Sequence, residues 1–374
     1  MKKIGILGGG QLGRMLLQSA INYPVETYLM ENDAWAPAAH LCHHFSLGDI
    51  TSFDDVYQFG KDLHAITIEI ENVNIEALEA LEKKGIKIFP NTTALRIVKN
   101  KIRQKQFYQQ NQIPTSEFVI TENRSDLMQH EGFFPAVHKL AEGGYDGKGV
   151  HIIQNKIDIE KGFDAPAVLE KKVPILRELS IIVAVNQQLE TVIYPPVEMV
   201  FDNYLNLLNY QICPANIPEK VLWKAEAIAL TAVKNLHSPG IFAVELFSDI
   251  DDNVLINEIA PRVHNSGHHS IEGNYSSQFD MLWRIMLGYP LGNTDTIIPS
   301  ALVNLVGVSN HQGKVRYKGL EDVLKMDNVF VHLYGKAETK PGRKMGHVTI
   351  LSNEKQELLH KVNQIKSLLT IVSE

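Results

Sequence analysis

The sequence predicts an α/β protein with three domains: a parallel-sheet domain at residues 1–95, an α+β domain at residues 96–295 and a small β-rich domain at residues 296–374. Three observations support this fold class. Apolar strand-like segments alternate with helix-like segments in the first ninety residues, a glycine-rich loop separates two strand-like segments in the middle, and β segments dominate the last seventy-five residues. Strands that alternate with helices form parallel sheets with helices on their faces.

The elements of the first domain follow in order. We expect strands at residues 3–7, 26–31, 65–69 and 87–89, and helices at residues 11–20, 52–60 and 75–84. Gly8, Gly10 and Gly13 have the spacing G-x-G-x-x-G between a strand and a helix, and Glu31 ends the next strand. This is close to the dinucleotide fingerprint, in which a helix N-terminus meets a pyrophosphate and an acid meets the ribose.

The same glycines suit any strand that turns tightly into a helix beside an anion. The rest of the chain has no evident His–Asp or Tyr–Lys arrangement for hydride transfer. We therefore expect Gly10 and Gln11 to contact a substrate, and NAD binding is the alternative.

The second and third domains mix strands and helices. A polar, helix-prone stretch at residues 91–110 comes first, and residues 294–299 resemble a linker. We expect strands at residues 134–139, 150–153, 168–173, 180–185, 241–247, 254–259, 301–306, 329–333 and 347–351, and helices at residues 218–236, 277–287 and 355–368.

The glycine-rich loop AEGGYDGKGV is the most informative stretch of the chain. It holds four glycines within seven residues, one lysine before them and one among them: Gly143, Gly144, Gly147, Gly149, Lys139 and Lys148. Glycine amides can approach a ligand closely, and the lysines add cationic donors, so we expect the loop to hold phosphate. Its order differs from the GxxxxGK[ST] of a P-loop. The alternative is a flexible hairpin tip with solvated lysines.

A second chemical signal comes from the predicted hairpin. Its two strands, joined by the turn-rich residues 248–253, place Glu245 opposite Asn257 or Glu258. Like charges that face each other across strands are destabilising, and burial adds a further penalty. A Mg²⁺ ion between them removes both penalties, and it prefers carboxylates, an amide oxygen and substrate phosphates. The alternative is a protonated or outward-facing glutamate.

Composition excludes several classes of protein. The formal net charge of −7 argues against nucleic-acid and membrane-surface binding but permits anionic small ligands. Cys42 and Cys213 lie far apart without CxxC spacing, which is typical of buried thiols in a reducing compartment. The apolar run after MKK is too short for a signal peptide, and no window approaches a membrane span. We expect a cytoplasmic protein with small-molecule partners.

These motifs together resemble the ATP-grasp superfamily and, within it, the N5-carboxyaminoimidazole ribonucleotide synthetases, which use bicarbonate in purine synthesis. The resemblance rests on GILGGGQLGRML (5–16), ITIEIENV (66–73), GGYDGKG (143–149), EKKV (170–173), INEIAPRVHNSGHHSIEG (256–273) and YGKAETKPGRKMGH (334–347). It implies a Rossmann-like pre-ATP-grasp domain, a two-lobed ATP-grasp domain with a lid lobe at about residues 113–175, and a C-terminal domain. It also implies ATP, two Mg²⁺ ions, bicarbonate and a homodimer.

For ATP, the resemblance implies a role for each motif. Lys101 and Lys139 would contact phosphates, Glu170 would accept from the adenine amino group, and Glu178 would bind the ribose. Phe201 stands where relatives often have a histidine. The implied nucleotide-binding residues are Lys101, Lys139, Gly144, Tyr145, Asp146, Gly147, Lys148, Gly149, Glu170, Lys171, Lys172, Val173, Glu178, Phe201, Asn257 and Glu258, and the implied metal ligands are Glu245, Asn257 and Glu258.

For the other substrates, a guanidinium fork and a neutral donor suit bicarbonate, and the resemblance assigns these to Arg262 and His264. The implied ribonucleotide-binding residues are Gly10, Gln11, Glu71, Tyr145, Asn265, Ser266, Lys336, Arg343 and Lys344. The implied catalytic residues are Asp146, as the base for the amine, together with Arg262, His264 and Lys336. The string His264, His268 and His269 could suggest zinc, but the intervening Asn-Ser-Gly disfavours a helical site.

The reaction implied by the resemblance begins with attack of bicarbonate on the γ-phosphate of ATP. The resulting carboxyphosphate then carboxylates the exocyclic amine of 5-aminoimidazole ribonucleotide. A formate-dependent glycinamide ribonucleotide transformylase is the nearest alternative, whereas length and the short basic C-terminal domain disfavour a biotin carboxylase. An NAD-dependent dehydrogenase and a non-catalytic nucleotide sensor are the alternatives from other classes.

Overall fold

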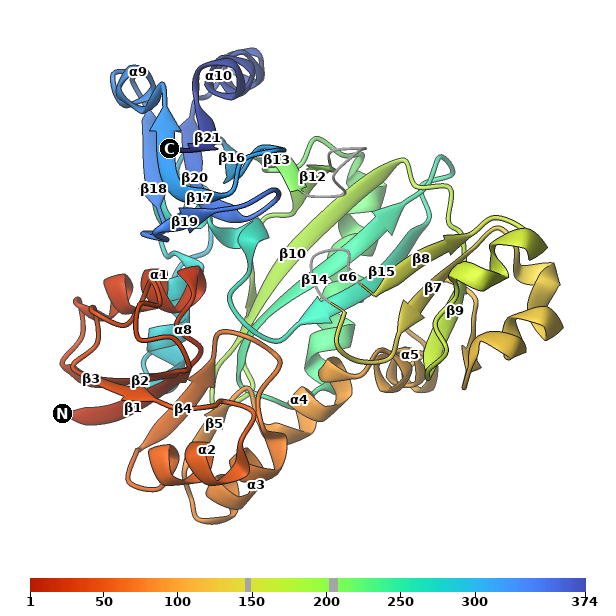
Figure 1. Cartoon of the computed structure of the whole chain (residues 1–374), viewed down its shortest axis with the longest axis horizontal. Helices are drawn as coiled ribbons and strands as arrows, with labels where there is room; N and C mark the ends of the chain where they lie inside the picture. Colours follow the sequence, from red (N-terminus) through yellow and green to blue (C-terminus); the bar gives the residue numbers. More distant parts are fainter. Residues whose placement is uncertain (145–148, 202–207) are drawn as a thin grey trace.

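The computed structural model describes residues 1–144, 149–201 and 208–374 of the chain. Figure 1 shows the N-terminal domain in red and orange, a smaller lobe in yellow, a large sheet in green and the C-terminal domain in blue. This arrangement confirms the predicted class: a parallel N-terminal sheet, a two-lobed central region and a β-rich C-terminal part. The predicted domain boundaries remain a prediction.

The N-terminal sheet has five parallel strands in the order β3-β2-β1-β4-β5. The strands are β1 (Lys2–Leu7), β2 (Val25–Glu31), β3 (His44–Leu47), β4 (Ala65–Ile68) and β5 (Lys87–Phe89), and the helices are α1 (Gln11–Ala20), α2 (Phe53–Gly60) and α3 (Ile75–Lys83). Every predicted element is present to within one residue at each end. The sequence does not predict β3, because this exposed edge strand has no buried residue and so no apolar run.

The polar stretch at residues 91–110 forms two helices rather than one. They are α4 (Thr92–Lys99) and α5 (Lys101–Gln110). Asn100 has an extended backbone, and its side chain accepts a hydrogen bond from the amide of Arg103, so it caps the start of α5. The new helix start places Lys101 and Lys105 four residues apart, on one face of α5.

The smaller lobe is a four-stranded antiparallel sheet in the order β6-β9-β7-β8. Its elements are β6 (Phe118–Thr121), η1 (Arg124–Phe133), β7 (Ala136–Leu140), β8 (Val150–Ile153), η2 (Lys156–Lys161) and β9 (Ala167–Lys171). The glycine-rich loop connects β7 to β8, as predicted. Gly149 has a φ of +84°, and a Cβ there would lie 2.8 Å from the Cα of Gly144, so this end of the loop requires glycine.

The large sheet has nine strands and runs through two of the predicted domains. Its path is β15-β14-β10-β12-β13-β16-β20-β18, with β11 paired to β10. The central strands are β10 (Arg177–Val185), β11 (Thr191–Ile193), β12 (Val197–Phe201), β13 (Leu208–Cys213), β14 (Gly240–Ser248) and β15 (Val254–Ala260). Helix α6 (Glu219–Asn235) packs on β10, β14 and β15. Glu178 lies within β10 and not in the connection before it, because β10 begins three residues earlier than predicted.

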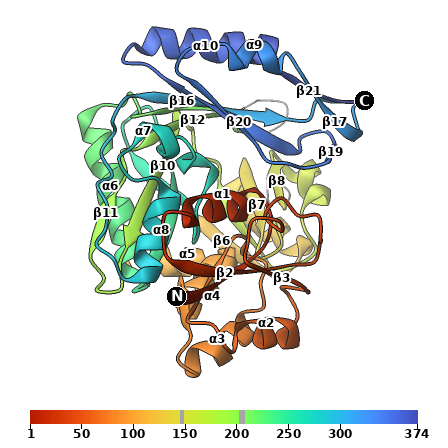
Figure 2. The same cartoon turned by 90° about the vertical axis from the view of Figure 1, so that its left-hand side faces the viewer.

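The C-terminal strands continue the same sheet. Figure 2 shows two helices along the outer side of these strands. The elements are β16 (Ser300–Val306), β17 (Gly313–Lys318), α9 (Leu320–Leu324), β18 (Val329–Leu333), β19 (Glu338–Thr339), β20 (Lys344–Leu351), α10 (Lys355–Leu368) and β21 (Thr370–Ser373). Within the described residues, no helix is both long and apolar enough to cross a membrane.

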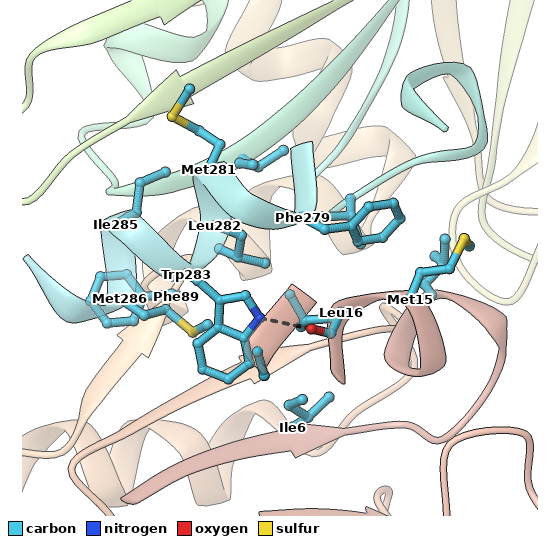
Figure 3. Close-up of a cluster of buried hydrophobic side chains, with 14 of the residues drawn as sticks. Ile6, Met15, Leu16, Phe89, Phe279, Met281, Leu282, Trp283, Ile285 and Met286 are labelled. Carbon is cyan, nitrogen blue, oxygen red and sulfur yellow. Dashed lines mark hydrogen bonds between the residues drawn. The ribbon is translucent and has the colours of Figure 1, made fainter. Parts of the chain in front are cut away.

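A shared hydrophobic core connects the N-terminal domain to the large sheet. Helix α8 (Gln278–Leu287) packs against α1, and Figure 3 shows the indole of Trp283 between them. The indole nitrogen donates a hydrogen bond to the carbonyl oxygen of Leu16 at 2.7 Å, and the Trp283 side chain is fully buried. This core fixes the N-terminal domain beside the candidate site.

Candidate active site

The hairpin of β14 and β15 brings the two predicted carboxylates together. Glu245 pairs directly with Glu258, whereas the next pair is Leu246 with Ile256. Asn257 is therefore an extra residue in β15, which makes the hairpin bulged. Neighbouring residues in a regular strand point to opposite faces, so the bulge allows Asn257 and Glu258 to serve the same side of the sheet.

Lysine side chains meet this bulge from two other elements. Lys101 at the start of α5 forms an ion pair with Glu258, and Nζ of Lys139 in β7 lies 2.8 Å from Oδ1 of Asn257. Burial and then the adjacent Glu258 carboxylate raise the pKa of Glu245, whereas the Lys101 ammonium lowers the pKa of Glu258. Without a further cation, this arrangement therefore favours a charged Glu258 and a protonated Glu245. A second positive charge beside the pair would favour ionisation of both.

The donor set at the bulge fits magnesium with phosphate better than a metal held by protein alone. Among residues 1–144, 149–201 and 208–374, no three His, Cys, Asp or Glu side chains are grouped closely enough to form a metal site. Glu245, Glu258 and the amide oxygen of Asn257 offer hard oxygen ligands, which Mg²⁺ combines with water and substrate phosphates. Their role as metal ligands remains a prediction.

A buried carboxylate lies beneath these lysines. Glu170 at the end of β9 has Lys139 at 3.0 Å from one oxygen and Lys105 at 2.8 Å from the other, and the hydroxyl of Ser116 donates to it at 2.5 Å. Burial raises the pKa of Glu170, but the ammonium groups of Lys139 and Lys105 outweigh this and lower it to about 2. Lys105 and Ser116 were not among the predicted site residues. The spacing of Lys105 from Lys101 along a helix was the available signal.

Glu178 of β10 lies close enough to Glu245 for its charge to raise the pKa of that carboxyl. It pairs with Phe247 of β14 on one side and Met199 of β12 on the other. Burial raises its pKa to about 7, against the opposing effect of Lys139. Phe201 ends β12 two residues beyond Met199 and packs in a small apolar cluster, which suits a residue that adds contact area but no hydrogen bond.

The predicted bicarbonate residues lie beside the carboxylate hairpin. Nε2 of His264 lies 3.6 Å from Glu245, and its Nδ1 lies 2.9 Å from the Ser266 hydroxyl. The side chain of Gln278 accepts from the His264 amide at 2.8 Å and donates to the His264 carbonyl at 2.7 Å. Gln278 is buried and was missed, because it lies fourteen residues away on α8. It fixes the backbone of His264.

Arg262 connects this region to the N-terminal domain. Its Nε donates to the carboxylate of Glu71 at 2.9 Å, and its Nη1 donates to the carbonyl of Val263 at 3.1 Å. Asn265 and Ser266 lie in the short helix η3 (Asn265–Gly267), ahead of α7 (Ser270–Gly273). The Ser266 hydroxyl lies 2.7 Å from that of Ser180 in β10. The structure thus brings Glu71, Arg262, His264 and Ser266 together, and their roles in binding bicarbonate and the ribonucleotide remain predictions.

Two carboxylates from other segments of the protein accept hydrogen bonds from backbone amides at the start of α1. Glu69 accepts from the amides of Gly10 at 3.0 Å and Leu12 at 3.3 Å, and Glu31 accepts from the amide of Gly9 at 2.7 Å. A Cβ on Gly10 would lie 2.5 Å from Glu69, which explains glycine there. An acid at the helix start opposes a pyrophosphate at the same place, which disfavours NAD binding. The roles of Gly10 and Gln11 in substrate binding remain predictions.

The basic cluster predicted in the C-terminal domain, Lys336, Arg343 and Lys344, follows a residue that lies close to the N-terminal domain, Gly335. Nζ of Lys336 donates to the carbonyl of Lys344 at 2.8 Å, and Arg343 donates to the carbonyl of Glu338 at 2.8 Å. A Cβ added to Gly335 would lie 3.5 Å from the guanidinium of Arg14 in α1. Arg14 is therefore a further cation close to Gly335, the residue before Lys336, and it was not predicted because this segment lies at the far end of the chain.

The roles of the remaining predicted residues stay predictions. Tyr145, Asp146, Gly147 and Lys148 lie outside the described residues. The backbone amides of Lys171 and Lys172 donate to the carbonyls of Glu117 and Pro135, and the Val173 carbonyl accepts from Ile175. His268 and His269 are buried, and their Nδ1 atoms lie within hydrogen-bond distance of Gln278 and Gln211, respectively.

Comparisons with known proteins identify the family of each part of the chain. Three family models match successive parts of the chain: a ribonucleotide synthetase preATP-grasp domain at residues 1–99, an ATP-grasp domain at residues 106–279, and a phosphoribosylaminoimidazole carboxylase C-terminal domain at residues 300–361.

Individual relatives match along nearly the whole chain. N5-carboxyaminoimidazole ribonucleotide synthase of Aquifex aeolicus is 34% identical, and the alignment covers 99% of this chain and 97% of that protein. A phosphoribosylaminoimidazole carboxylase of Vigna aconitifolia is 33% identical over 94% of this chain, which spans 64% of that longer protein. The crystal structure of N5-carboxyaminoimidazole ribonucleotide synthetase from Thermotoga maritima has a TM-score of 0.91 at 36% identity and covers 100% of both chains. The chain therefore belongs to the N5-carboxyaminoimidazole ribonucleotide synthase family of ATP-grasp proteins.

Proposed function

We propose that this chain catalyses the ATP- and bicarbonate-dependent carboxylation of 5-aminoimidazole ribonucleotide to N5-carboxyaminoimidazole ribonucleotide, with release of ADP and phosphate. The observation that carries the proposal is the bulged hairpin, where Glu245, Asn257 and Glu258 meet Lys101 and Lys139 beside His264. Two structures of an Aspergillus clavatus relative support both ligands, since one is described as a complex with ATP and the other as a complex with ADP and the ribonucleotide.

The nucleotide would lie between the smaller lobe and the hairpin. Glu170 and the backbone after it would bind the adenine, Glu178 would accept from ribose hydroxyls, and Lys139 and Lys101 would bind phosphates. Glu245, Asn257 and Glu258 would hold two Mg²⁺ ions, whose charge stabilises the phosphoryl group in transit. Lys101 and Lys139 must then exchange their present partners Glu258 and Asn257 for phosphate oxygens.

Arg262 and His264 would bind and orient bicarbonate next to the γ-phosphate. An oxygen of bicarbonate attacks the γ-phosphorus, the bond to the β-phosphate oxygen breaks, and ADP leaves. The exocyclic amine of the ribonucleotide then attacks the carbonyl carbon of carboxyphosphate and phosphate leaves. The amine proton goes to a base, for which Asp146, outside the described residues, is our candidate.

The basic cluster at the C-terminal domain would bind the 5′-phosphate of the ribonucleotide. Lys336 and Arg343 would supply ammonium and guanidinium donors, Lys344 would add charge, and Arg14 lies close to Gly335, the residue before Lys336. Glu71, Gly10 and Gln11 would contact the rest of this substrate from the N-terminal domain. We further propose a homodimer in the cytoplasm, which sedimentation of the purified protein and fractionation of cells would test.

The decisive experiment measures ADP release with Mg²⁺, ATP and labelled bicarbonate, with and without 5-aminoimidazole ribonucleotide. We expect ribonucleotide-dependent ADP release and label in an acid-labile product. ADP release without incorporation would overturn the proposed acceptor, and a parallel reaction with formate and glycinamide ribonucleotide would then test the transformylase alternative. No ADP release in any mixture would overturn the proposal and favour the sensor or the dehydrogenase.

A further inference from the structure

One buried lysine of the candidate site has no part in the proposed function. The side chain of Lys105 in α5 is 3% exposed. Its Nζ lies 2.8 Å from Glu170, 2.6 Å from the Thr115 hydroxyl and 3.1 Å from the Ser116 hydroxyl. A buried ammonium is costly unless it is paired and fully hydrogen-bonded, and three oxygens satisfy that need here. Lys105 is therefore held in one place.

Lys139, the other cation at Glu170, contacts residues of two different elements. It is 11% exposed and contacts both Glu170 at 3.0 Å and Asn257 at 2.8 Å. In the proposed function, phosphate oxygens draw the Lys139 ammonium toward the hairpin. The Glu170 carboxylate would then lose part of the stabilisation that the Lys139 ammonium gives it. The bound nucleotide would add negative charge nearby at the same time. Lys105 faces no such competition, because Thr115 and Ser116 hold it on the far side of the carboxylate.

The contacts of Glu170 leave room for a nucleotide. An ionised carboxylate offers about four lone-pair sites and can only accept hydrogen bonds. Among the described residues, Lys139 uses a site on one oxygen, whereas Lys105 and Ser116 share the other oxygen. The remaining site lies on the oxygen that faces Lys139 and suits the donor of a 6-amino group.

We propose that Lys105 is a positioning residue for adenine recognition: it holds Glu170 charged and in place, so that the carboxylate accepts from the 6-amino group while Lys139 turns to phosphate. The inference rests on the ATP site of the proposed function. It predicts that discrimination for the amino group, and not only nucleotide affinity, depends on Lys105.

The test compares two nucleotides by titration calorimetry in Mg²⁺ buffer without bicarbonate or ribonucleotide. One is ADP, and the other is purine riboside 5′-diphosphate, which lacks only the 6-amino group. We expect the parent protein to prefer ADP about tenfold or more, the range for a hydrogen bond to a charged group. Lys105→Met should bind ADP at least about tenfold more weakly and lose most of this preference. The control Arg103→Met removes an exposed cation from the same helix and should retain the parental preference.

A second variant guards against loss of folding. If Lys105→Met unfolds because Glu170 is left buried without its partner, Lys105→Met combined with Glu170→Gln should fold again and show little preference between the two nucleotides. Failure of this double variant to fold would overturn the proposal, because Lys105 would then act on the fold through other contacts. A folded Lys105→Met with the parental preference, or with equal loss for both nucleotides, would overturn it as well. Absence of ADP binding by the parent would instead overturn the proposed ATP site.

Discussion

Burial of the Glu178 carboxylate makes the stability of the folded protein depend on pH. An ordinary glutamate has a pKa near 4.3 in an unfolded chain, whereas burial raises that of Glu178 to about 7. Between these values the folded protein binds more protons than the unfolded chain does. The contribution of Glu178 to the free energy of unfolding is therefore present at low pH and lost as the pH rises through this window.

Replacement Glu178→Gln should raise the melting temperature of the ligand-free protein at pH 8, because it removes a buried charge, and should raise it less at pH 5, near the start of this window. The same replacement should weaken ADP binding about tenfold, since an amide oxygen replaces a charged acceptor. Thermal melts at both pH values and calorimetry with ADP measure the two effects. A lower melting temperature at pH 8 would contradict this account of Glu178.

Glu258 tests the metal assignment. Replacement Glu258→Gln keeps the shape of the side chain but removes the charge that would hold Mg²⁺, so ADP formation should fall about 100-fold or more. The fold should persist, because Lys101 still has Glu245 nearby to stabilise its charge. Turnover and circular dichroism measure activity and fold, and the exposed Glu219→Gln on α6 is the matched control. Retained turnover in a folded variant would refute the role of Glu258.

At the scale of single elements, the start of α1 depends on a carboxylate from another segment of the same domain. Burial raises the pKa of Glu69, and the amide of Gly10 opposes this rise. Replacement Glu69→Ala would leave the amides of Gly10 and Leu12 without this acceptor and should cost about 1–2 kcal/mol, as loss of a helix cap does. Denaturant titration measures the loss, and Asp62→Ala, which removes an exposed acid seven residues earlier, serves as control. Equal midpoints for the two variants would contradict the capping role.

Elements with strong local signals could be predicted from the sequence. Helix α1 and strand β5 have the predicted ends, and β14 and β15 form the expected hairpin with Glu245 opposite Glu258. The bulge at Asn257 could not be predicted, because periodicity fixes which face a strand buries and not where an extra residue is accommodated. The break at Asn100 was missed for a related reason, since a polar helix-prone stretch conceals its internal cap.

Contacts between distant elements set the limit for predicting the site. Lys101 and Lys139 were assigned through family motifs, and the structure places both at the hairpin. Lys105 was missed because its partner Glu170 lies in a different element and much later in the chain. The spacing from Lys101 indicates which face of α5 carries Lys105, but the pairing of that lysine with Glu170 depends on packing between elements. The hydrogen bond between Gln278 and the backbone of His264 likewise depends on packing between elements and was not predicted.

At the scale of the whole molecule, the three predicted domains are not structurally separate. The core around Trp283 joins α1 of the N-terminal domain to α8 of the central domain. The large sheet passes from the central to the C-terminal domain through antiparallel pairing of β13 with β16, from Cys213 with Ser300 to Tyr210 with Val303. Substrate-binding residues predicted from all three domains therefore lie on one connected framework.

This continuity predicts how the chain unfolds. Because no domain can separate without exposing an apolar core or a sheet edge, calorimetry should show one cooperative transition, and two resolved transitions would contradict the shared core.

A chain that ends at residue 295 should aggregate, because the loss of β16 exposes the hydrogen-bonding edge of β13, whose Ile212 is buried against the C-terminal domain. Size-exclusion chromatography measures this outcome. A soluble, monodisperse fragment that still binds ADP would show that the sheet can end at β13, and that the C-terminal strands serve the ribonucleotide site alone.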